Sequence, residues 1–352
     1  MSAVLVAYVS GHGYGHWTRL GEVLRAIREI DRSLPLTLVG ELPEALVRRA
    51  VPGHLPFRRL RCDVGLAQRS ALEIDEEATA ERCREFDATW EERVAAESDF
   101  LRRSGARLVL GDIPPLAFAA SARAGIPSLA LGNFSWDWIY RHLAVRQPSL
   151  AAAAERAARA YASADLLLEL PFSGDLAAFP RRERVGLVAR RPKVGRAEAR
   201  RALGLGSEVT VLVSFGGIGL PGLTPDLLSR NAGLRFLGPA DLEPRLDRLG
   251  LGYPDVVGAV DVVLTKPGYG IVSDAIAARA RVVYTDRGDF PEYPILVREM
   301  PRYLACTYVS REDLGAGRLA DPIDRVLRLP LPETADLGGA NRAAARVLAA
   351  LS

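Results

Sequence analysis

The chain has 352 residues, which is long enough for two domains of ordinary size. Its composition, 49% hydrophobic and 25% charged, is that of a globular protein, and it has no apolar run as long as a membrane span. The formal net charge is +3 with basic residues scattered among acids, which excludes an extended nucleic-acid-binding surface.

Residues 1–9 predict a strand and lack the basic leader and cleavage site of a signal peptide, so we expect a cytoplasmic protein. The cysteines Cys62, Cys83 and Cys306 are odd in number and widely spaced. This spacing argues against a disulfide framework and against a zinc site.

The first half of the chain alternates short β-rich runs with longer helical runs. Strand patterns occupy residues 3–9, 34–40, 57–62, 106–112, 126–133 and 165–170. Helical patterns lie between them at 18–30, 42–50 and 72–104, and the last of these ends at a glycine. The alternation predicts a parallel sheet with crossover helices.

A Pro- and Arg-rich segment at 171–195 is typical of a linker, and after it the same alternation begins again. We therefore expect an N-terminal doubly wound domain over 1–175 and a second one over 176–335. A last helix within 336–352 is expected to pack back on the first domain. Two such domains would face a central cleft with the carboxyl ends of both sheets, where ligands bind in open α/β folds.

The stretch "SGHGYGHWTR", residues 10–19, follows the first strand and holds two of the chain's four histidines, His12 and His16. A turn that cradles phosphate favours small residues, whereas bulky polar and aromatic side chains fill this one. The turn therefore favours proton transfer or substrate contact. The alternative is that these histidines only cap or pack the start of a helix.

Two further strand ends in the first half carry candidate residues. Asp112 ends the strand at 106–112, although an aspartate before "IPP" is also common in a plain turn. The next strand is followed by "NFSWDWIY", whose aromatic rings either face a substrate or pack the domain interior.

In the second half, "TKPGYGIVSDAIAA" passes from a strand end through two glycines into a helix. Free N–H groups and the positive end of the helix dipole at such a start suit a diphosphate. Asp274, one turn into the helix, either accepts hydrogen bonds from a ribose diol or only stabilises the helix start. Lys266, one of two lysines in the chain, offsets phosphate charge or is simply solvated. "SFGGIG" supplies a second glycine-rich turn.

These motifs resemble known families. The layout resembles the GT-B glycosyltransferases, and the second half is similar to the sugar-nucleotide domain of the peptidoglycan lipid II glycosyltransferase, with Asp274 where a glutamate is usual. "SGHGYGHWTR", "CDVGLAQRSALEID", "NFSWDWIY", "KPGYGIVSDAIA" and "DRGDFPEYPILVREM" resemble, in order and spacing, the glycosyltransferase-like amino-terminal region of plant L-arabinokinases and their bacterial relatives. The kinase half of those proteins has no counterpart here. The first turn also resembles the UDP-sugar hydrolase of pseudaminic acid synthesis, in which the histidine matched by His16 activates water.

The resemblance implies a metal-independent, inverting hexosyltransferase that uses a nucleotide sugar, expected to be a UDP-sugar, and a small-molecule or natural-product acceptor, without a further cofactor. His16 is the expected general base because a histidine's ordinary pKa of about 6.5 suits proton removal near neutral pH. Asp112 would orient it, and His12 is the reserve base.

The expected donor-binding residues are Gly216, Gly217, Lys266, Gly268, Tyr269, Gly270, Ser273, Asp274 and Glu292. The expected acceptor-binding residues are Tyr14, Trp17, Arg19, Gln68, Phe134, Trp136 and Asp137. No cluster of side chains in the sequence indicates a metal site.

Two other functions stay open at this point. The same scaffold would support a nucleotide-sugar hydrolase or epimerase, or a binding protein without catalysis. The sequence leaves the nucleotide base, the sugar, the acceptor and a homodimeric state undetermined.

Overall fold

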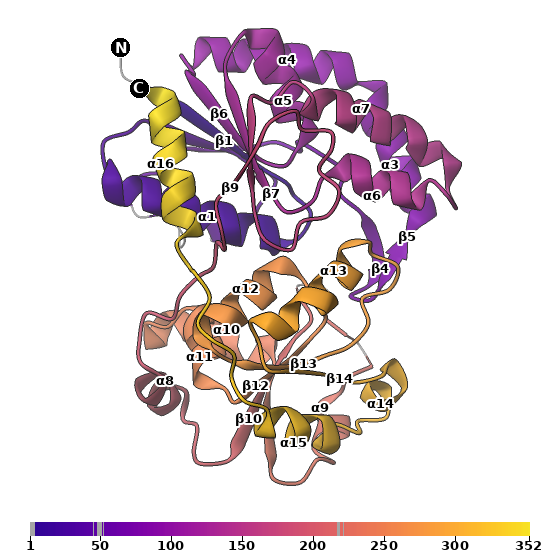
Figure 1. Ribbon diagram of the computed structural model, residues 1–352, viewed down its shortest axis with the longest axis vertical. Helices are drawn as coiled ribbons and strands as arrows, with labels where there is room; N and C mark the ends of the chain where they lie inside the picture. The colour runs from indigo at the N-terminus through magenta and orange to yellow at the C-terminus, as the bar shows by residue number, and fades with distance from the viewer. Residues whose placement is uncertain (1–3, 45, 48–50, 52, 217–218, 221) are drawn as a thin grey trace. The chain divides into compact units, whose positions relative to one another are not determined.

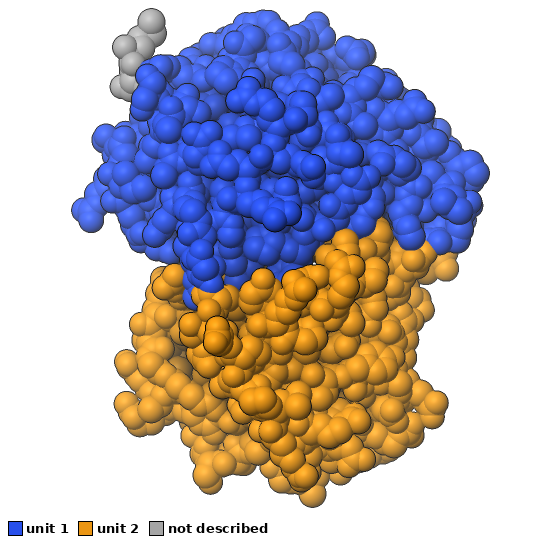
Figure 2. Space-filling view, in the orientation of Figure 1, with its two compact units in different colours: residues 1–67, 75–188, 336–352 blue, residues 68–74, 189–335 orange. Residues whose placement is uncertain are grey.

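The computed structural model describes residues 4–44, 46–47, 51, 53–216, 219–220 and 222–352. The chain forms two compact units, coloured separately in Figure 2. Unit 1 comprises residues 1–67, 75–188 and 336–352, and unit 2 comprises residues 68–74 and 189–335.

Unit 1 contains a seven-stranded parallel sheet in the order β3-β2-β1-β6-β7-β8-β9. Its strands are β1 (Leu5–Val9), β2 (Leu36–Gly40), β3 (Phe57–Arg59), β6 (Leu108–Asp112), β7 (Ser128–Gly132), β8 (Leu166–Glu169) and β9 (Arg182–Arg184). The central strands are buried along their whole length, which explains why they are continuous apolar runs rather than alternating ones.

Helices cover this sheet, and in Figure 1 the last of them, α16, crosses α1, with which it is in contact. The helices of unit 1 are α1 (Tyr14–Ile30), α3 (Glu76–Ala88), α4 (Trp90–Arg103), α5 (Pro115–Ala124), α6 (Trp136–Leu143), η1 (Pro148–Leu150), α7 (Ala151–Tyr161) and α16 (Gly339–Leu351). The structure thus brings the last helix of the chain into unit 1.

Unit 2 contains a five-stranded parallel sheet in the order β11-β10-β12-β13-β14. Its strands are β10 (Val209–Ser214), β11 (Leu234–Leu237), β12 (Val262–Thr265), β13 (Arg281–Tyr284) and β14 (Cys306–Tyr308). Its helices are α8 (Arg196–Leu203), α9 (Pro225–Leu228), α10 (Pro239–Leu249), α11 (Tyr253–Ala259), α12 (Tyr269–Ala278), α13 (Glu292–Glu299), η2 (Met300–Arg302), α14 (Arg311–Gly315) and α15 (Ala320–Arg328).

A small hairpin, β4 (Ala67–Ser70) with β5 (Glu73–Asp75), belongs mostly to unit 2 although it lies early in the sequence. Its turn residues Ala71 and Leu72 are buried in the apolar core of that unit. The chain therefore passes between the units at 67/68, 74/75, 188/189 and 335/336.

Two sequence-based expectations differ from the structure. The expected long helix over 72–104 is strand β5 followed by two helices, because Asp75 caps α3 through the Ala78 N–H and Thr89 has a non-helical backbone between α3 and α4. The first domain extends past 175, because residues 182–184 of the expected linker add strand β9 to its sheet.

Candidate active site

Three polar side chains meet where β1, β6 and β7 end. His16 lies in the first turn of α1, Asp112 is the last residue of β6, and Asn133 directly follows β7. The register pairs Val9 with Asp112, so the turn after β1 begins beside that carboxylate. The carboxyl edge of a doubly wound sheet is where ligands bind, which makes this cluster a candidate active site.

The centre of the cluster is a buried triad of His16, Asp112 and Arg19. The Nδ1 atom of His16 lies 2.8 Å from Oδ1 of Asp112. Arg19 donates to both oxygens of the same carboxylate, from Nε at 2.6 Å and from a terminal nitrogen at 2.7 Å. His16 and Arg19 are three residues apart on α1 and so share one face of the helix. All three side chains are at most 4% exposed.

The carboxylate of Asp112 is held in its charged form. Burial alone would raise the pKa of this group, but the charge of Arg19, the proximity of His16 and the hydrogen bonds from both outweigh burial and keep the pKa below its ordinary value. An ionised carboxylate accepts from the Nδ1–H of the imidazole, which leaves the Nε2 lone pair of His16 to take a proton. The arrangement thus fixes the orientation of the His16 ring through Nδ1 and leaves Nε2 able to accept a proton.

A second carboxylate, Asp63, lies beside this triad and was not anticipated from the sequence. Its oxygens accept from Nε1 of Trp136 at 3.0 Å and from the Gly11 N–H at 3.4 Å. Burial raises its pKa, against the lowering effect of the Ser10 hydroxyl and of His16. Asp63 thus ties the loop after β3 to the glycine turn after β1.

His12 occupies a different environment from His16. Its Nδ1 accepts a hydrogen bond from the Leu66 N–H at 3.1 Å, so the ring proton of the neutral form is on Nε2. The ring meets Trp136 edge to face, with ring centroids 5.2 Å apart. Gly65 lies so close that a Cβ there would be 2.5 Å from Cβ of His12. His12 is therefore fixed by the loop that carries Asp63.

Aromatic rings enclose the triad. Phe134 and Trp136 stand with ring centroids 5.4 Å and 6.0 Å from His16, and Tyr140 stacks on Trp136. The structure corrects the expectation that Trp136 offers a face to an acceptor, because its side chain is fully buried. Phe134 is 5% exposed and Trp17 is 3% exposed, with Nε1 of Trp17 donating to a backbone carbonyl.

The remaining expected acceptor residues lie in varied surroundings. Tyr14 is 46% exposed and is available to a ligand, whereas Arg19 is committed to Asp112. Asp137 is buried and pairs with Arg141, and burial raises the pKa of its carboxyl. Gln68 lies in β4, in the hairpin segment that is assigned to unit 2.

The second cluster of expected residues is the turn between β12 and α12 in unit 2. Gly268 caps α12, and a Cβ on it would lie 3.6 Å from a guanidinium nitrogen of Arg287. Lys266 precedes this turn and donates from Nζ to the Ala71 carbonyl at 2.5 Å. Burial, together with the charge of Arg287, lowers the pKa of Lys266 to about 8. Two cations beside a helix start favour binding of an anion.

Asp274 is buried and already has a cationic partner. The Arg190 guanidinium pairs with it, and the Arg190 N–H donates to Oδ1 at 3.3 Å. The carboxylate thus anchors the segment by which the chain enters unit 2. Its contact with a ribose stays a prediction.

Glu292, the other acidic donor candidate, is 2% exposed and pairs with Arg287 at 2.5 Å. Arg287 also covers the ring of Phe290, with its Cζ atom 4.0 Å from the ring centroid. Ser273 donates to the carbonyl of Gly270 inside α12. The acid and the arginine of the "DRGDFPEYP" motif are therefore a pair.

Two of the remaining donor candidates lie in the described structure. Tyr269 begins α12 and is 5% exposed, and Gly216 follows β10 with a φ of 75°. Gly217 lies outside the described residues.

Sequence reasoning missed Asp63, Asn133, Arg190 and Arg287 as partners of the candidate residues. Asp63 and Arg287 stand inside motifs that the sequence singled out, "CDVGLAQRSALEID" and "DRGDFPEYPILVREM". A polar residue directly after a buried strand was the available signal for Asn133. Arg190 has no such signal, since arginines are common throughout this chain.

Among the described residues, no group of three or more His, Cys, Asp or Glu side chains is arranged to hold a metal ion. Within the same residues, no helix combines the length and apolar character needed to cross a membrane.

Comparison with known proteins adds a sequence relative and many structural ones. No protein-family model matches the chain. Over 336 residues it is 30% identical to L-arabinokinase of Arabidopsis thaliana, an alignment that covers 93% of this chain and 32% of that protein. The chain thus spans about a third of the length of the curated relative it matches.

Solved structures match over the whole chain. The glycotransferase of kitacinnamycin matches with a TM-score of 0.61 and 16% identity, over 99% of this chain and 96% of its own. A UDP-glucosyltransferase from Polygonum tinctorium capable of glucosylating indoxyl matches with a TM-score of 0.59 and 12% identity, over 100% and 99%. The chain has the GT-B fold. Its two doubly wound units are built on the seven-stranded and five-stranded parallel sheets. The expected fold class is therefore confirmed.

Proposed function

We propose that this chain is an inverting, metal-independent glycosyltransferase that moves a hexose from a nucleotide sugar, by preference a UDP-sugar, to a hydroxyl group of a small-molecule acceptor. The observation that carries the proposal is the buried triad in which Arg19 and Asp112 orient His16. One structural neighbour is a UDP-glucosyltransferase capable of glucosylating indoxyl, which supports the donor and acceptor classes.

In the proposed reaction, Nε2 of His16 removes the proton of the acceptor hydroxyl as its oxygen attacks the anomeric carbon of the donor sugar. The bond from that carbon to the phosphate oxygen breaks, and the nucleoside diphosphate leaves with the bonding electrons. Attack from the face opposite the leaving group inverts the anomeric centre. Asp112 stabilises the imidazolium that forms, as a buried carboxylate does for a histidine base.

Unit 2 is proposed to bind the donor. The start of α12, with Lys266 and Arg287 beside it, would offset the charge of the leaving diphosphate, the role that a divalent cation has in metal-dependent transferases. Asp274, Glu292 and the glycines of both turns are proposed donor contacts. The cytoplasm is the proposed compartment, since the described cysteines are free.

A panel of UDP-, GDP- and dTDP-sugars, tested with and without phenolic and sugar acceptors in the presence of EDTA, examines this proposal. We expect nucleotide release that depends on the acceptor and a product of inverted anomeric configuration. Release without acceptor would instead indicate a hydrolase, a changed sugar an epimerase, and binding without turnover a non-catalytic protein.

The His16→Ala variant tests the assignment of the base. We expect kcat to fall by about a hundredfold to ten-thousandfold, the usual contribution of a positioned general base. His54→Ala is the matched control, since His54 is exposed in unit 1. Turnover that survives in His16→Ala and falls in His12→Ala would move the base to the neighbouring histidine.

A further inference from the structure

The segment 63–72, which we call the strap, carries contacts of both units along a single stretch of chain. At its first end Asp63 accepts from Trp136, and the Leu66 N–H donates to Nδ1 of His12. These partners surround the proposed base. Any displacement of this end of the strap therefore displaces the histidine cluster.

The second end of the strap is docked in unit 2. The side chains of Ala71 and Leu72 are 1% and 7% exposed in the core of that unit. Their carbonyls accept from Nζ of Lys266 at 2.5 Å and from the Arg311 guanidinium at 3.3 Å. Gly288 approaches so closely that a Cβ on it would lie 2.5 Å from the Leu72 carbonyl oxygen. The strap thus touches both loops of the proposed donor site.

The ammonium of Lys266 can hold two partners at once. It has three N–H donors, of which one goes to the Ala71 carbonyl, and the described residues offer it no second hydrogen-bond acceptor. Burial beside Arg287 disfavours its charged form. A diphosphate oxygen would supply the missing acceptor and restore the charge, which strengthens the bond to Ala71.

We propose that the strap couples the donor to the base: a nucleoside diphosphate bound at Lys266 tightens the strap on unit 2 and so fixes the loop that holds His12 and Asp63 beside His16. This coupling rests on the proposed function, whose donor site it uses. Lys266 acts in it as a positioning residue, because it transmits diphosphate binding to Ala71.

Thermodynamic reciprocity makes the coupling measurable from either side. If the diphosphate stabilises the docked strap, then loosening the strap must weaken diphosphate binding by the same factor. The strap residue Leu72 is suited to the second measurement, because its side chain lies in the core of unit 2 and its backbone carbonyl accepts from Arg311.

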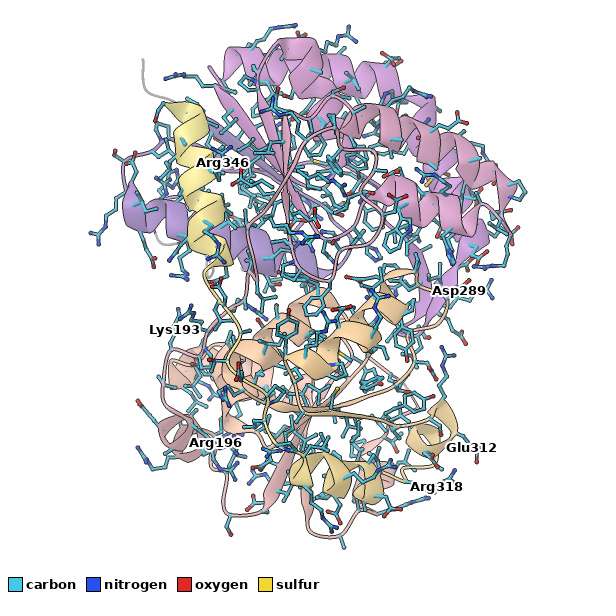
Figure 3. The ribbon with its side chains drawn as sticks, viewed as in Figure 1. Lys193, Arg196, Asp289, Glu312, Arg318 and Arg346 are labelled. Carbon is cyan, nitrogen blue, oxygen red and sulfur yellow. The ribbon has the colours of Figure 1, made fainter. Side chains whose placement is uncertain are left out.

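The first experiment is hydrogen exchange of the full chain with and without saturating UDP, GDP, dTDP or ADP. The nucleotide that binds should slow exchange of the amides of residues 64–72 and 11–16 by roughly fivefold or more. Lys266→Met, measured at nucleotide concentrations that saturate it, should lose this protection. Lys193→Met, which changes the other lysine, should keep it, since that side chain is exposed on the loop before α8 (Figure 3).

The second experiment compares Leu72→Ser with Leu228→Ser, a matched change in the same core but outside the strap. Leu72→Ser should weaken nucleotide binding by roughly fivefold or more, and Leu228→Ser should change it far less at temperatures where both variants are folded.

The outcomes separate the two proposals. If none of the four nucleotides binds, the proposed function fails and the coupling fails with it. If a nucleotide binds and supports turnover while exchange in 64–72 is unchanged, or while the two leucine variants bind it equally, the coupling alone is wrong.

Discussion

Two buried aspartates beside one histidine have pKa values shifted in opposite directions. Both lose water, but Asp112 gains a two-point contact with Arg19, whereas the partners of Asp63 are neutral donors and His16. A full positive charge outweighs the cost of burial, and neutral hydrogen bonds do not. The charge of Arg19 thus determines which of the two carboxylates stays ionised beside His16.

The Asp112→Asn variant tests the role of this carboxylate in stability. At pH 7 it should lower the free energy of unfolding by about 3 kcal/mol, because Arg19 is left as a buried charge without its partner. The pKa of Asp112 is lower in the folded protein than in the unfolded chain, where it is about 3.9. The carboxylate therefore stabilises the fold in full above about pH 3.9, and this stabilisation is lost as the pH falls through the pKa of the folded state.

Urea unfolding at several pH values, followed by tryptophan fluorescence, measures this difference. All four tryptophans lie in unit 1, so the signal reports that unit. The gap between wild type and Asp112→Asn should stay constant from pH 7 to about 4.5 and shrink below about 4. A gap that is constant down to pH 3 would contradict the ion pair.

Lys266 gives a second prediction at the scale of single residues. Its pKa of about 8 means that the ammonium is charged at pH 7 and largely neutral at pH 9.5. Affinity for UDP should therefore fall about tenfold over this range, because a hydrogen bond to a charged group contributes ~1.5 kcal/mol. Calorimetric titration measures it, and Lys266→Arg should bind UDP with little dependence on pH, since a guanidinium stays protonated.

At the scale of elements, the loop that follows β3 is shaped by Gly65. Its φ of 64° favours glycine, and a Cβ on it would lie 2.5 Å from Cβ of His12. Gly125 has a similar φ of 70° but no atom within 4 Å of its would-be Cβ. Substituting each of these two glycines therefore distinguishes the cost of backbone strain from the effect of displacing His12.

Gly125→Ala should cost about 1 kcal/mol of stability, the ordinary penalty of a left-handed alanine, with turnover unchanged. Gly65→Ala should cost more than this and should also lower kcat, because His12 and the loop beside it must move. Unfolding and turnover measured on both variants provide the check, and equal effects of the two would argue against a role of the loop in positioning the site.

Helices and strands that the local sequence pattern determines can be predicted from the sequence. Those that form only by pairing with a segment far away in the chain cannot. The buried parallel strands such as Leu108–Asp112 are recognisable because both faces of the sheet are covered. Strand β9 was missed because Arg182–Arg184 carries no apolar signal and becomes a strand by pairing with β8. The expected helix over 72–104 ignored the pairing of β5 with β4.

The same limit applies to the candidate site. Two histidines in a glycine turn point to the turn after β1, and the resemblance favours His16 over His12 as the base, which stays a prediction. The place of Asp112 at a strand end makes it a candidate to orient the base. Arg19 was expected at an acceptor, because only the folded helix shows that it shares a face with His16 and points to Asp112. Likewise, the pairing of Asp274 with Arg190 joins residues that are 84 positions apart.

At the scale of the whole molecule, unit 1 is completed by a helix that lies after unit 2 in the sequence. The helix α16 packs on α1, and its buried face includes Val347 and Ala344, which are both fully buried. Arg346, labelled on α16 in Figure 3, instead forms an exposed pair with Glu183. Neighbouring positions on α16 are therefore expected to contribute very different amounts to the stability of unit 1.

The Val347→Asp variant should destabilise unit 1 by about 3 kcal/mol or more, because it places an unpaired charge at a fully buried position. Arg346→Ala should cost less than about 1 kcal/mol, as exposed ion pairs do. Tryptophan fluorescence in urea reports both, and a Val347→Asp variant as stable as Arg346→Ala would show that α16 is dispensable to unit 1.

The return of the chain to unit 1 has a consequence for biosynthesis. As the polypeptide leaves the ribosome, the sheet of unit 1 emerges first, yet the apolar stripe on α1 stays uncovered until the last turns of α16 have been translated. Unit 2 has by then emerged in full. The nascent protein therefore carries an exposed hydrophobic surface from the emergence of α1 until the emergence of α16, and this is the kind of surface that chaperones recognise.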